Sequence, residues 1–115
     1  MSPFIHWENE LPLQEVWQGM TARMIHTGKI TIARFNIKAG TQLPLHHHPH
    51  EQISTILEGE FEMNVDGVAQ VCGPGMSIVI PSNAPHSGHA LSDCVIIDVF
   101  QPSRDDYRVP GNGNR

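Results

Sequence analysis

Apolar residues in this chain form short runs, most of which alternate with polar residues and end at Gly, Pro, Asn or Asp. A period of two is typical of strands that bury one face, and no long segment after residue 20 has the 3.6-residue period of an amphipathic helix. We therefore expect an all-β fold. The expected strands cover residues 22–26, 30–37, 52–57, 59–65, 69–72, 76–80, 86–90 and 94–100.

The turns between these strands favour a closed architecture. Asp66-Gly67 lies between two expected strands, and a type I′ hairpin turn needs the positive φ that glycine adopts without steric cost. Gly59 and the segment Gly73-Pro74-Gly75 punctuate the chain similarly. Short strands spaced by roughly 8–12 residues suggest a barrel or a sandwich, because closure removes open sheet edges. We predict a single β-barrel.

The two ends of the chain differ in composition. Residues 1–19 are too apolar for a free tail, since they contain Phe4, Ile5, Trp7, Leu11, Leu13, Val16 and Trp17. We expect these residues to form an arm that packs on the barrel or on a partner subunit. The barrel is expected to cover residues 20–102 and a tail residues 103–115, of which 109–115 carry almost nothing apolar and should fray.

Length and charge narrow the kinds of ligand. A chain of 115 residues fits one domain. Its formal net charge of -5, without a Lys/Arg cluster, argues against a nucleic-acid partner and makes a small molecule the expected ligand. No run approaches the roughly 18 apolar residues that span a membrane. Cys72 and Cys94 lack C-x-x-C spacing and the N-terminus lacks a signal-like run, so we expect a cytoplasmic protein with buried thiols.

Two histidine-bearing segments predict one metal site. His46 and His48 are two apart, and side chains two apart on an extended strand point to the same face. Gln52 and His86 are expected to complete the site around one divalent transition metal, since imidazole suits zinc, nickel, iron and copper. His47 should point away.

Simpler interpretations of these residues stay open. The histidine cluster could be a solvated polar loop, or one with only nonspecific affinity for transition metals. His86 by itself could be a hydrogen-bonded histidine inside the barrel. His50, Glu51 and His89 are candidates for the rim of the site.

The same segments resemble the cupins. Their first motif is Gly, five residues, His-x-His, three or four residues, Glu, six residues, Gly, which is matched by Gly40, His46, His48 and Gly59, with the neutral amide Gln52 where the carboxylate Glu is usual. Their second motif is matched by Gly75, Pro81 and His86, with Asn83 and Ala90 where Gly and Asn are usual. The resemblance covers about residues 30–100. It implies a single-domain RmlC-like jelly-roll barrel with an internal divalent metal, such as nickel, zinc, iron or manganese.

The last expected strand carries a further candidate group. Asp98 and Phe100 fall on one face of this strand, opposite the apolar residues at 95, 97 and 99. A buried unpaired carboxylate is costly, so Asp98 should meet a partner, a water-filled cavity or a proton. The alternative is an ion pair with an internal arginine such as Arg34. Phe100 could be a wall for a sugar ring or a core residue.

Arg104 follows this strand and also has two interpretations. Its guanidinium could fold over the barrel mouth and clamp a carboxylate through two parallel hydrogen bonds. Alternatively, it could be a solvated side chain beside Asp105 and Asp106.

The combined pattern His-x-His-Pro-His-Glu-Gln and Asp-Val-Phe-x-Pro-x-Arg-x-Asp-Tyr is similar to the pectin-degradation cupins. This resemblance implies metal-dependent opening of 4,5-unsaturated uronate monosaccharides, left by pectate and alginate lyases, to the linear keto form. It places Asp98, Phe100 and Arg104 at functional positions and implies a homodimer. A cupin dioxygenase and a non-enzymatic sugar-binding cupin are the alternatives.

Overall fold

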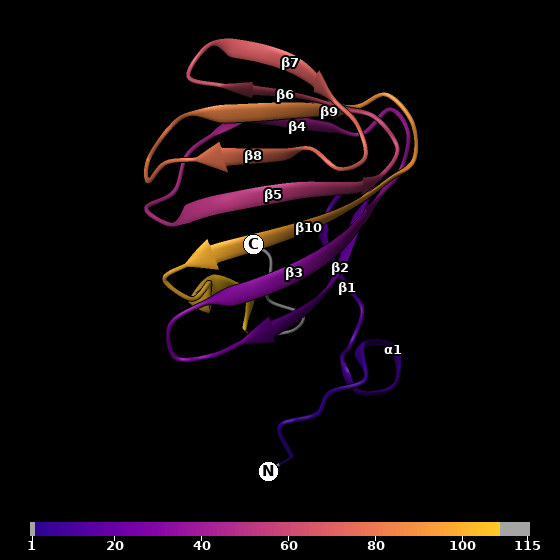
Figure 1. Ribbon diagram of the computed structural model, residues 1–115, viewed down its shortest axis with the longest axis vertical. Coiled ribbons are helices and arrows are strands. Elements are labelled where there is room, and N and C mark those ends of the chain that lie inside the picture. The colour runs from indigo at the N-terminus through magenta and orange to yellow at the C-terminus, as the bar shows by residue number, and fades with distance from the viewer. Residues whose placement is uncertain (1, 109–115) are drawn as a thin grey trace.

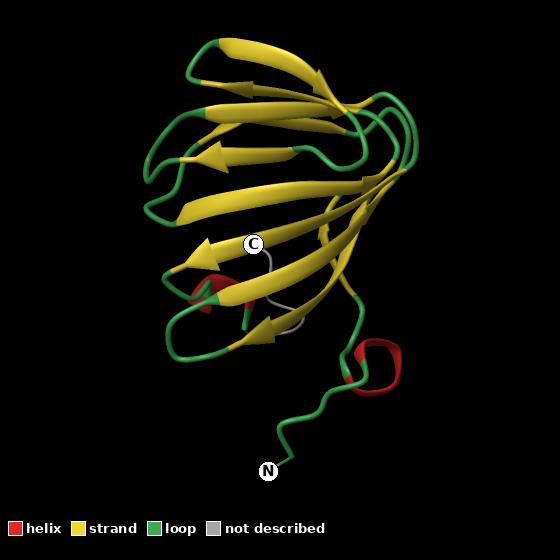
Figure 2. Ribbon diagram, in the orientation of Figure 1, coloured by secondary structure: helices red, strands yellow, loops and turns green. Residues whose placement is uncertain are grey.

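The computed structural model describes residues 2–108, whose strands form two antiparallel sheets facing one another as a flattened barrel (Figures 1 and 2). The six-stranded sheet has the order β1 (Gln14–Trp17), β2 (Met20–His26), β3 (Thr31–Ile37), β10 (Cys94–Gln101), β5 (Glu51–Glu58) and β8 (Ser77–Ile80). The four-stranded sheet has the order β4 (Gln42–His46), β9 (His86–Ala90), β6 (Phe61–Val65) and β7 (Val68–Cys72). Two helical turns, α1 (Trp7–Glu10) and the 3-10 turn η1 (Asp105–Tyr107), flank the barrel.

The all-β prediction is confirmed, and each expected strand has a counterpart within a few residues. The expected strands did not include β1 and β4, which both lie at a sheet edge. An edge strand leaves one side of its backbone unpaired and therefore tolerates proline, and β4 contains Pro44. The hairpin at Asp66-Gly67 forms as predicted, with positive φ at both residues and Val65 opposite Val68.

The core lies between the two sheets. Along β10 the side chains alternate, so Ile96, Asp98 and Phe100 are buried inside while Val95, Ile97 and Val99 face outward. The remaining core side chains are mainly aliphatic and aromatic, among them Phe35, Ile37, Ile56, Phe61 and Met63. The alternation therefore places a carboxylate in the barrel interior.

The two ends of the chain differ in whether they pack on the barrel. Before β1 the chain leaves the body of the protein, and α1 buries none of its residues (Figure 1). At the other end, Ser103 and Arg104 are buried, so the chain after β10 still packs on the barrel. Residues 109–115, which we expected to fray, lie outside the described residues. A partner for the arm stays a prediction.

Two further sequence expectations concern thiols and membranes. Cys72 and Cys94 are buried and form no disulfide, and burial raises the pKa of both thiols. Within residues 2–108 there is no helix long and apolar enough to cross a membrane.

Gly59 and Gly67 have nearly the same φ but different surroundings. Substituting each by alanine therefore separates the stability cost of steric contact from the cost of a left-handed backbone. Gly59 has φ +84° and Gly67 has φ +83°, but a Cβ would overlap the Asp93 carbonyl oxygen only at Gly59. We expect Gly67→Ala to cost about 1–2 kcal/mol because of its left-handed backbone. Gly59→Ala should cost roughly 1–3 kcal/mol more through the contact with Asp93. Urea unfolding measures both, and equal losses would contradict the close approach at Gly59.

Candidate metal centre

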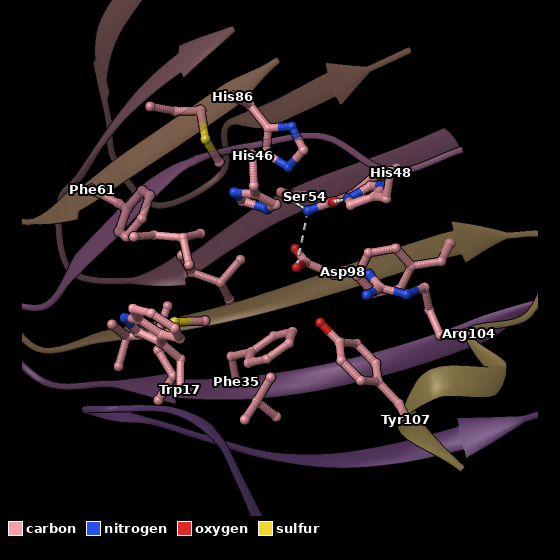
Figure 3. A pocket seen from close by; sticks show the side chains of 18 of the residues that line it. Trp17, Phe35, His46, His48, Ser54, Phe61, His86, Asp98, Arg104 and Tyr107 are labelled. Carbon is pink, nitrogen blue, oxygen red and sulfur yellow. Dashed lines mark hydrogen bonds between the residues drawn. The ribbon is translucent and has the colours of Figure 1, made fainter. Parts of the chain in front are cut away.

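A cavity of about 260 Å³ lies between the sheets and changes character along its length. One end is lined by apolar side chains such as Trp17, Phe35 and Phe61 (Figure 3). The other end is polar and is lined by His46, His48, Gln52, Ser54, His86, Asp98, Arg104 and Tyr107. The cavity thus offers apolar walls together with a small set of convergent polar groups, as ligand sites usually do.

Three histidines converge at the polar end. His46 ends β4 and lies directly opposite His86, the first residue of β9, while His48 comes from the loop after β4. One ligand atom from each lies within 4.8 Å of the others. The loop, rather than the strand alternation that we assumed, directs His48 inward, because β4 already ends at His46. His47 is exposed, as expected.

Backbone carbonyls determine which ring nitrogen of each histidine is free. The Nδ1 atoms of His46, His48 and His86 lie 2.8, 3.0 and 2.9 Å from the carbonyl oxygens of Pro44, His50 and Ala84. A carbonyl oxygen only accepts, so Nδ1 carries the proton and Nε2 keeps a lone pair in each neutral ring. Burial, with the positive charge of Arg104, lowers the pKa of His48 to about 4, and burial lowers the pKa of His86. Carbonyl partners of this kind orient metal-binding histidines.

Gln52 presents its amide oxygen to the same point. Its Nε2 donates to the Ser54 hydroxyl at 3.0 Å and to the Asp98 Oδ2 at 3.1 Å. Oε1 therefore faces the other way and lies 3.0 Å from the Nε2 of His48. Both atoms present lone pairs and repel each other at this distance. A cation bound by both would attract each of them and offset that repulsion. The four side chains thus fit one divalent transition metal, held by three imidazole nitrogens and one amide oxygen.

Asp98 lies beside this ligand set. Its Oδ2 accepts the hydrogen bond of Gln52, and its Oδ1 is buried without a hydrogen-bond partner among residues 2–108. Burial raises the pKa of Asp98 to about 7, against the opposing effects of Ser54 and the positive charge of Arg104. The alternative ion pair with Arg34 is wrong, because Arg34 is exposed and lies opposite the outward-facing Ile97. Asp98 can therefore hold or release a proton near neutral pH.

Arg104 is buried rather than solvated. Only 7% of the residue is exposed, and its Cζ lies 4.8 Å from the ring centre of Phe100 and 4.0 Å from that of Tyr107. Its Nε and Nη2 donate to Asp106 at 3.0 and 2.7 Å. Asp106 thus occupies the forked edge that could have clamped a ligand, and Nη1 is the guanidinium nitrogen that Asp106 does not engage.

Two residues of this site were missed by the sequence reasoning. Tyr107 lines the cavity, and Asp106 positions Arg104; in Figure 3 the Tyr107 ring lies beside the guanidinium. Both follow Arg104 within three residues, so the Arg-x-Asp-Tyr pattern was the available signal. Phe100 is buried and supports Arg104.

The three rim candidates have different positions. His50 packs edge-on against His48 and Phe100, with ring centroids 5.5 and 6.4 Å apart, and its carbonyl orients His48. Glu51 is exposed on β5. His89 lies opposite Glu62 in the four-stranded sheet and does not line the cavity.

The comparisons with known proteins agree with this fold and site. Residues 33–100 match the family described as Cupin domain, and the chain belongs to the cupin family. Within that family it resembles the KdgF proteins. It is 25% identical over 103 residues to the pectin degradation protein KdgF of Dickeya dadantii (strain 3937), covering 87% of this chain and 94% of that one.

Two solved cupin structures are also similar to this chain. The structure of KdgF from Halomonas sp. shares 30% identity at a TM-score of 0.80, covering 86% of this chain and 94% of that chain. An RmlC-like cupin from Shewanella frigidimarina NCIMB 400 shares 27% identity at a TM-score of 0.85, covering 92% and 96%.

The contact between Gln52 and Asp98 explains why an amide suits a position where cupins usually have Glu. In Gln52→Glu two carboxylates would meet inside the barrel. We expect this variant to lose roughly 2–3 kcal/mol of stability without metal, because like charges oppose each other there. Adding Asp98→Asn exchanges amide and carboxylate, restores the hydrogen bond and should recover most of the loss. Urea unfolding with a chelator at pH 8 measures this, and an unrestored double variant would disprove the pairing.

Proposed function

We propose that this protein is a metal-dependent enzyme that opens the ring of 4,5-unsaturated uronate monosaccharides to linear 4-deoxy-5-keto uronates. The observation that carries this proposal is the placement of a neutral ligand set, a carboxyl group with a pKa near 7 and a fixed arginine around one cavity. The similarity to KdgF proteins, one of which is named as a pectin degradation protein, supports the substrate class. A cavity of about 260 Å³ suits a monosaccharide better than an oligosaccharide.

The reaction needs one proton removed and one proton delivered. The substrate is a hemiacetal at C1 and an enol ether at C5. Loss of the C1 hydroxyl proton forms the C1 carbonyl and breaks the bond from C1 to the ring oxygen, which keeps the electron pair as an enolate at C5. Protonation of C4 then gives the 5-keto product. A bound divalent metal would supply Lewis-acid stabilisation of developing negative charge.

Asp98 has the properties that the proton transfers require. Asp98 lines the cavity, and its Oδ1 has no protein partner among the described residues, so the carboxyl group has hydrogen-bonding capacity left for a substrate hydroxyl. Its raised pKa lets the carboxylate accept the C1 hydroxyl proton and the carboxylic acid return a proton. The hydrogen bond from Gln52 holds the carboxyl group in place through Oδ2 meanwhile.

Arg104 is proposed to bind an oxygen of the substrate. Because Asp106 occupies Nε and Nη2, the free Nη1 offers a single contact rather than a two-pronged clamp. Phe100 and Tyr107 hold the guanidinium plane from their ring faces. A pre-positioned guanidinium loses little side-chain entropy when the substrate binds.

The first test follows the absorbance of the enol ether in fresh unsaturated uronate monomer. Metal-loaded protein should accelerate its loss, and protein stripped with a chelator should not. Oxygen uptake would instead support the dioxygenase alternative, and binding without turnover the sugar-binding alternative. No acceleration by metal-loaded protein would overturn the proposed reaction.

Asp98→Asn tests the proton transfer with little change of shape. The asparagine can still accept a hydrogen bond from Gln52, but it cannot exchange a proton. We expect turnover to fall by about 10²- to 10⁴-fold, with metal content unchanged by elemental analysis. Unchanged turnover would remove Asp98 from the mechanism.

Asp106→Asn tests the positioning of Arg104, with Asp105→Asn as its matched control. Asp105 is more exposed and pairs with Arg108 instead. Losing the charge-assisted pair with Arg104 should raise KM by about tenfold, because roughly 1.4 kcal/mol of ordered binding is lost. We expect Asp105→Asn to keep the wild-type KM. Equal KM values in the two variants would show that Asp106 does not position Arg104 for binding.

A further inference from the structure

Trp17 faces the cavity, although simple alternation along β1 would turn it outward. Glu15 lies opposite Thr21 on the outer face. Without an irregularity, Val16 would therefore lie opposite Met20, and Trp17 would face outward. The register instead shifts between Glu15 and Trp17, so that Trp17 lies opposite Met20, a core residue. This bulge directs the indole inward, as bulges beside ligand sites often do.

Trp17 also bridges the two sheets at one edge of the barrel. β1 ends the six-stranded sheet and β4 ends the four-stranded sheet, so the two strands belong to different ladders. The Nε1 of Trp17 donates to the Gln42 carbonyl oxygen on β4 at 3.0 Å. The cavity reaches this seam, because Val16 and Leu43 from the two edge strands line it together with Trp17. Since Trp17 is 46% exposed, its indole is held at the boundary between cavity and solvent.

The two ends of the cavity suit different parts of one uronate ring. Asp98 and Arg104 lie at the polar end with the histidines, and Figure 3 places Trp17 at the opposite end from Arg104. The carboxylate and the C1 hydroxyl of the substrate need these polar groups. A hydroxyl turned toward the apolar end would lose its hydrogen bonds to water without replacement, which is costly. The part of the substrate at the apolar end is therefore the part that presents C–H bonds.

The face of an indole is complementary to such a ring. Pyranose C–H bonds point out from the faces of the ring and carry a small positive charge, whereas the face of an aromatic side chain is negative. In an unsaturated uronate the double bond between C4 and C5 flattens this side of the ring, which permits close contact with a planar side chain. The linear keto product has no ring face. Stacking on Trp17 would thus favour the substrate over the product.

We propose that Trp17 is a substrate-binding residue, whose indole stacks on the ring of the bound uronate while the carboxylate of the sugar lies at the polar end. This inference rests on the proposed function and adds the residue that holds the sugar ring. Motif spacing gives no sign of it, because Trp17 lies upstream of both histidine-bearing segments. The hydrogen bond to Gln42 fixes the indole before the substrate arrives, so little side-chain freedom is lost on binding.

Fluorescence tests this contact, because the chain has two tryptophans and Trp7, on α1, does not line the cavity. In Trp7→Phe, Trp17 is the sole tryptophan. On rapid mixing of this metal-loaded variant with fresh unsaturated uronate monomer, Trp17 emission should change and then return as the enol-ether absorbance decays. Trp17→Phe, which keeps Trp7, is the matched control and should show no emission change. Absorbance decay without any change of Trp17 emission would overturn the stacking alone. An emission change without accelerated decay would support the contact and contradict the proposed reaction, and the absence of both signals would overturn both.

Substitution separates stacking from a role in closing the seam. Trp17→Phe keeps an aromatic face but loses the hydrogen bond to Gln42, whereas Trp17→Leu keeps apolar bulk without a flat face. We expect KM to rise about tenfold in Trp17→Leu and only about threefold in Trp17→Phe, with kcat nearly unchanged in both. Circular dichroism checks that the variants fold. Equal KM values in the two folded variants would show that Trp17 only closes the seam and would overturn the proposal.

Discussion

The hydrogen bond from Gln52 to Asp98 is the contact on which the rest of the site depends. It fixes the amide so that the nitrogen faces the carboxylate and the oxygen faces His48. A carboxylate at position 52 could not donate this bond. The same contact thus directs the Gln52 oxygen toward the histidines and holds the Asp98 carboxyl group beside them.

The register of the six-stranded sheet makes this contact possible. β10 pairs with β5 so that Phe100 lies opposite Gln52, and Asp98 opposite Ser54. All four residues face the interior, and burial there raises the pKa of Asp98 while Ser54 and Gln52 keep its carboxyl group oriented. The chain after β10 then places Arg104, clamped by Asp106, at the same cavity. One pair of strands and one short turn thus assemble the groups that we propose act on a substrate.

The two faces of β10 contribute to different parts of the protein. The inward residues of β10 serve the cavity, and its outward residues contribute to an apolar surface. Because the two sets alternate along the strand, substitutions on one side reach the other only through the backbone. We expect the cavity and the outer face of the sheet to respond independently to most side-chain changes.

The sequence by itself determined the strands with strong alternation, the class of fold and the placement of Asp98 and Phe100 on one face of their strand. These properties depend on neighbouring residues, since a period of two assigns each side chain to a face before any packing occurs. Motif spacing likewise grouped His46, His48, Gln52 and His86, which the fold brings to one cavity. The edge strands β1 and β4 carried too little apolar pattern to be found.

Only the tertiary structure decided which atoms face one another. It showed that Arg34 is not the partner of Asp98. It also showed that Asp106 binds the forked edge of Arg104 and that Tyr107 lines the cavity. It also showed that outward aliphatic residues from five neighbouring strands lie opposite one another across the six-stranded sheet. Apart from Arg104 and Asp106, which are two residues apart, these contacts join residues far apart in sequence. Their geometry is set by sheet register and loop paths, which no local pattern in the chain encodes.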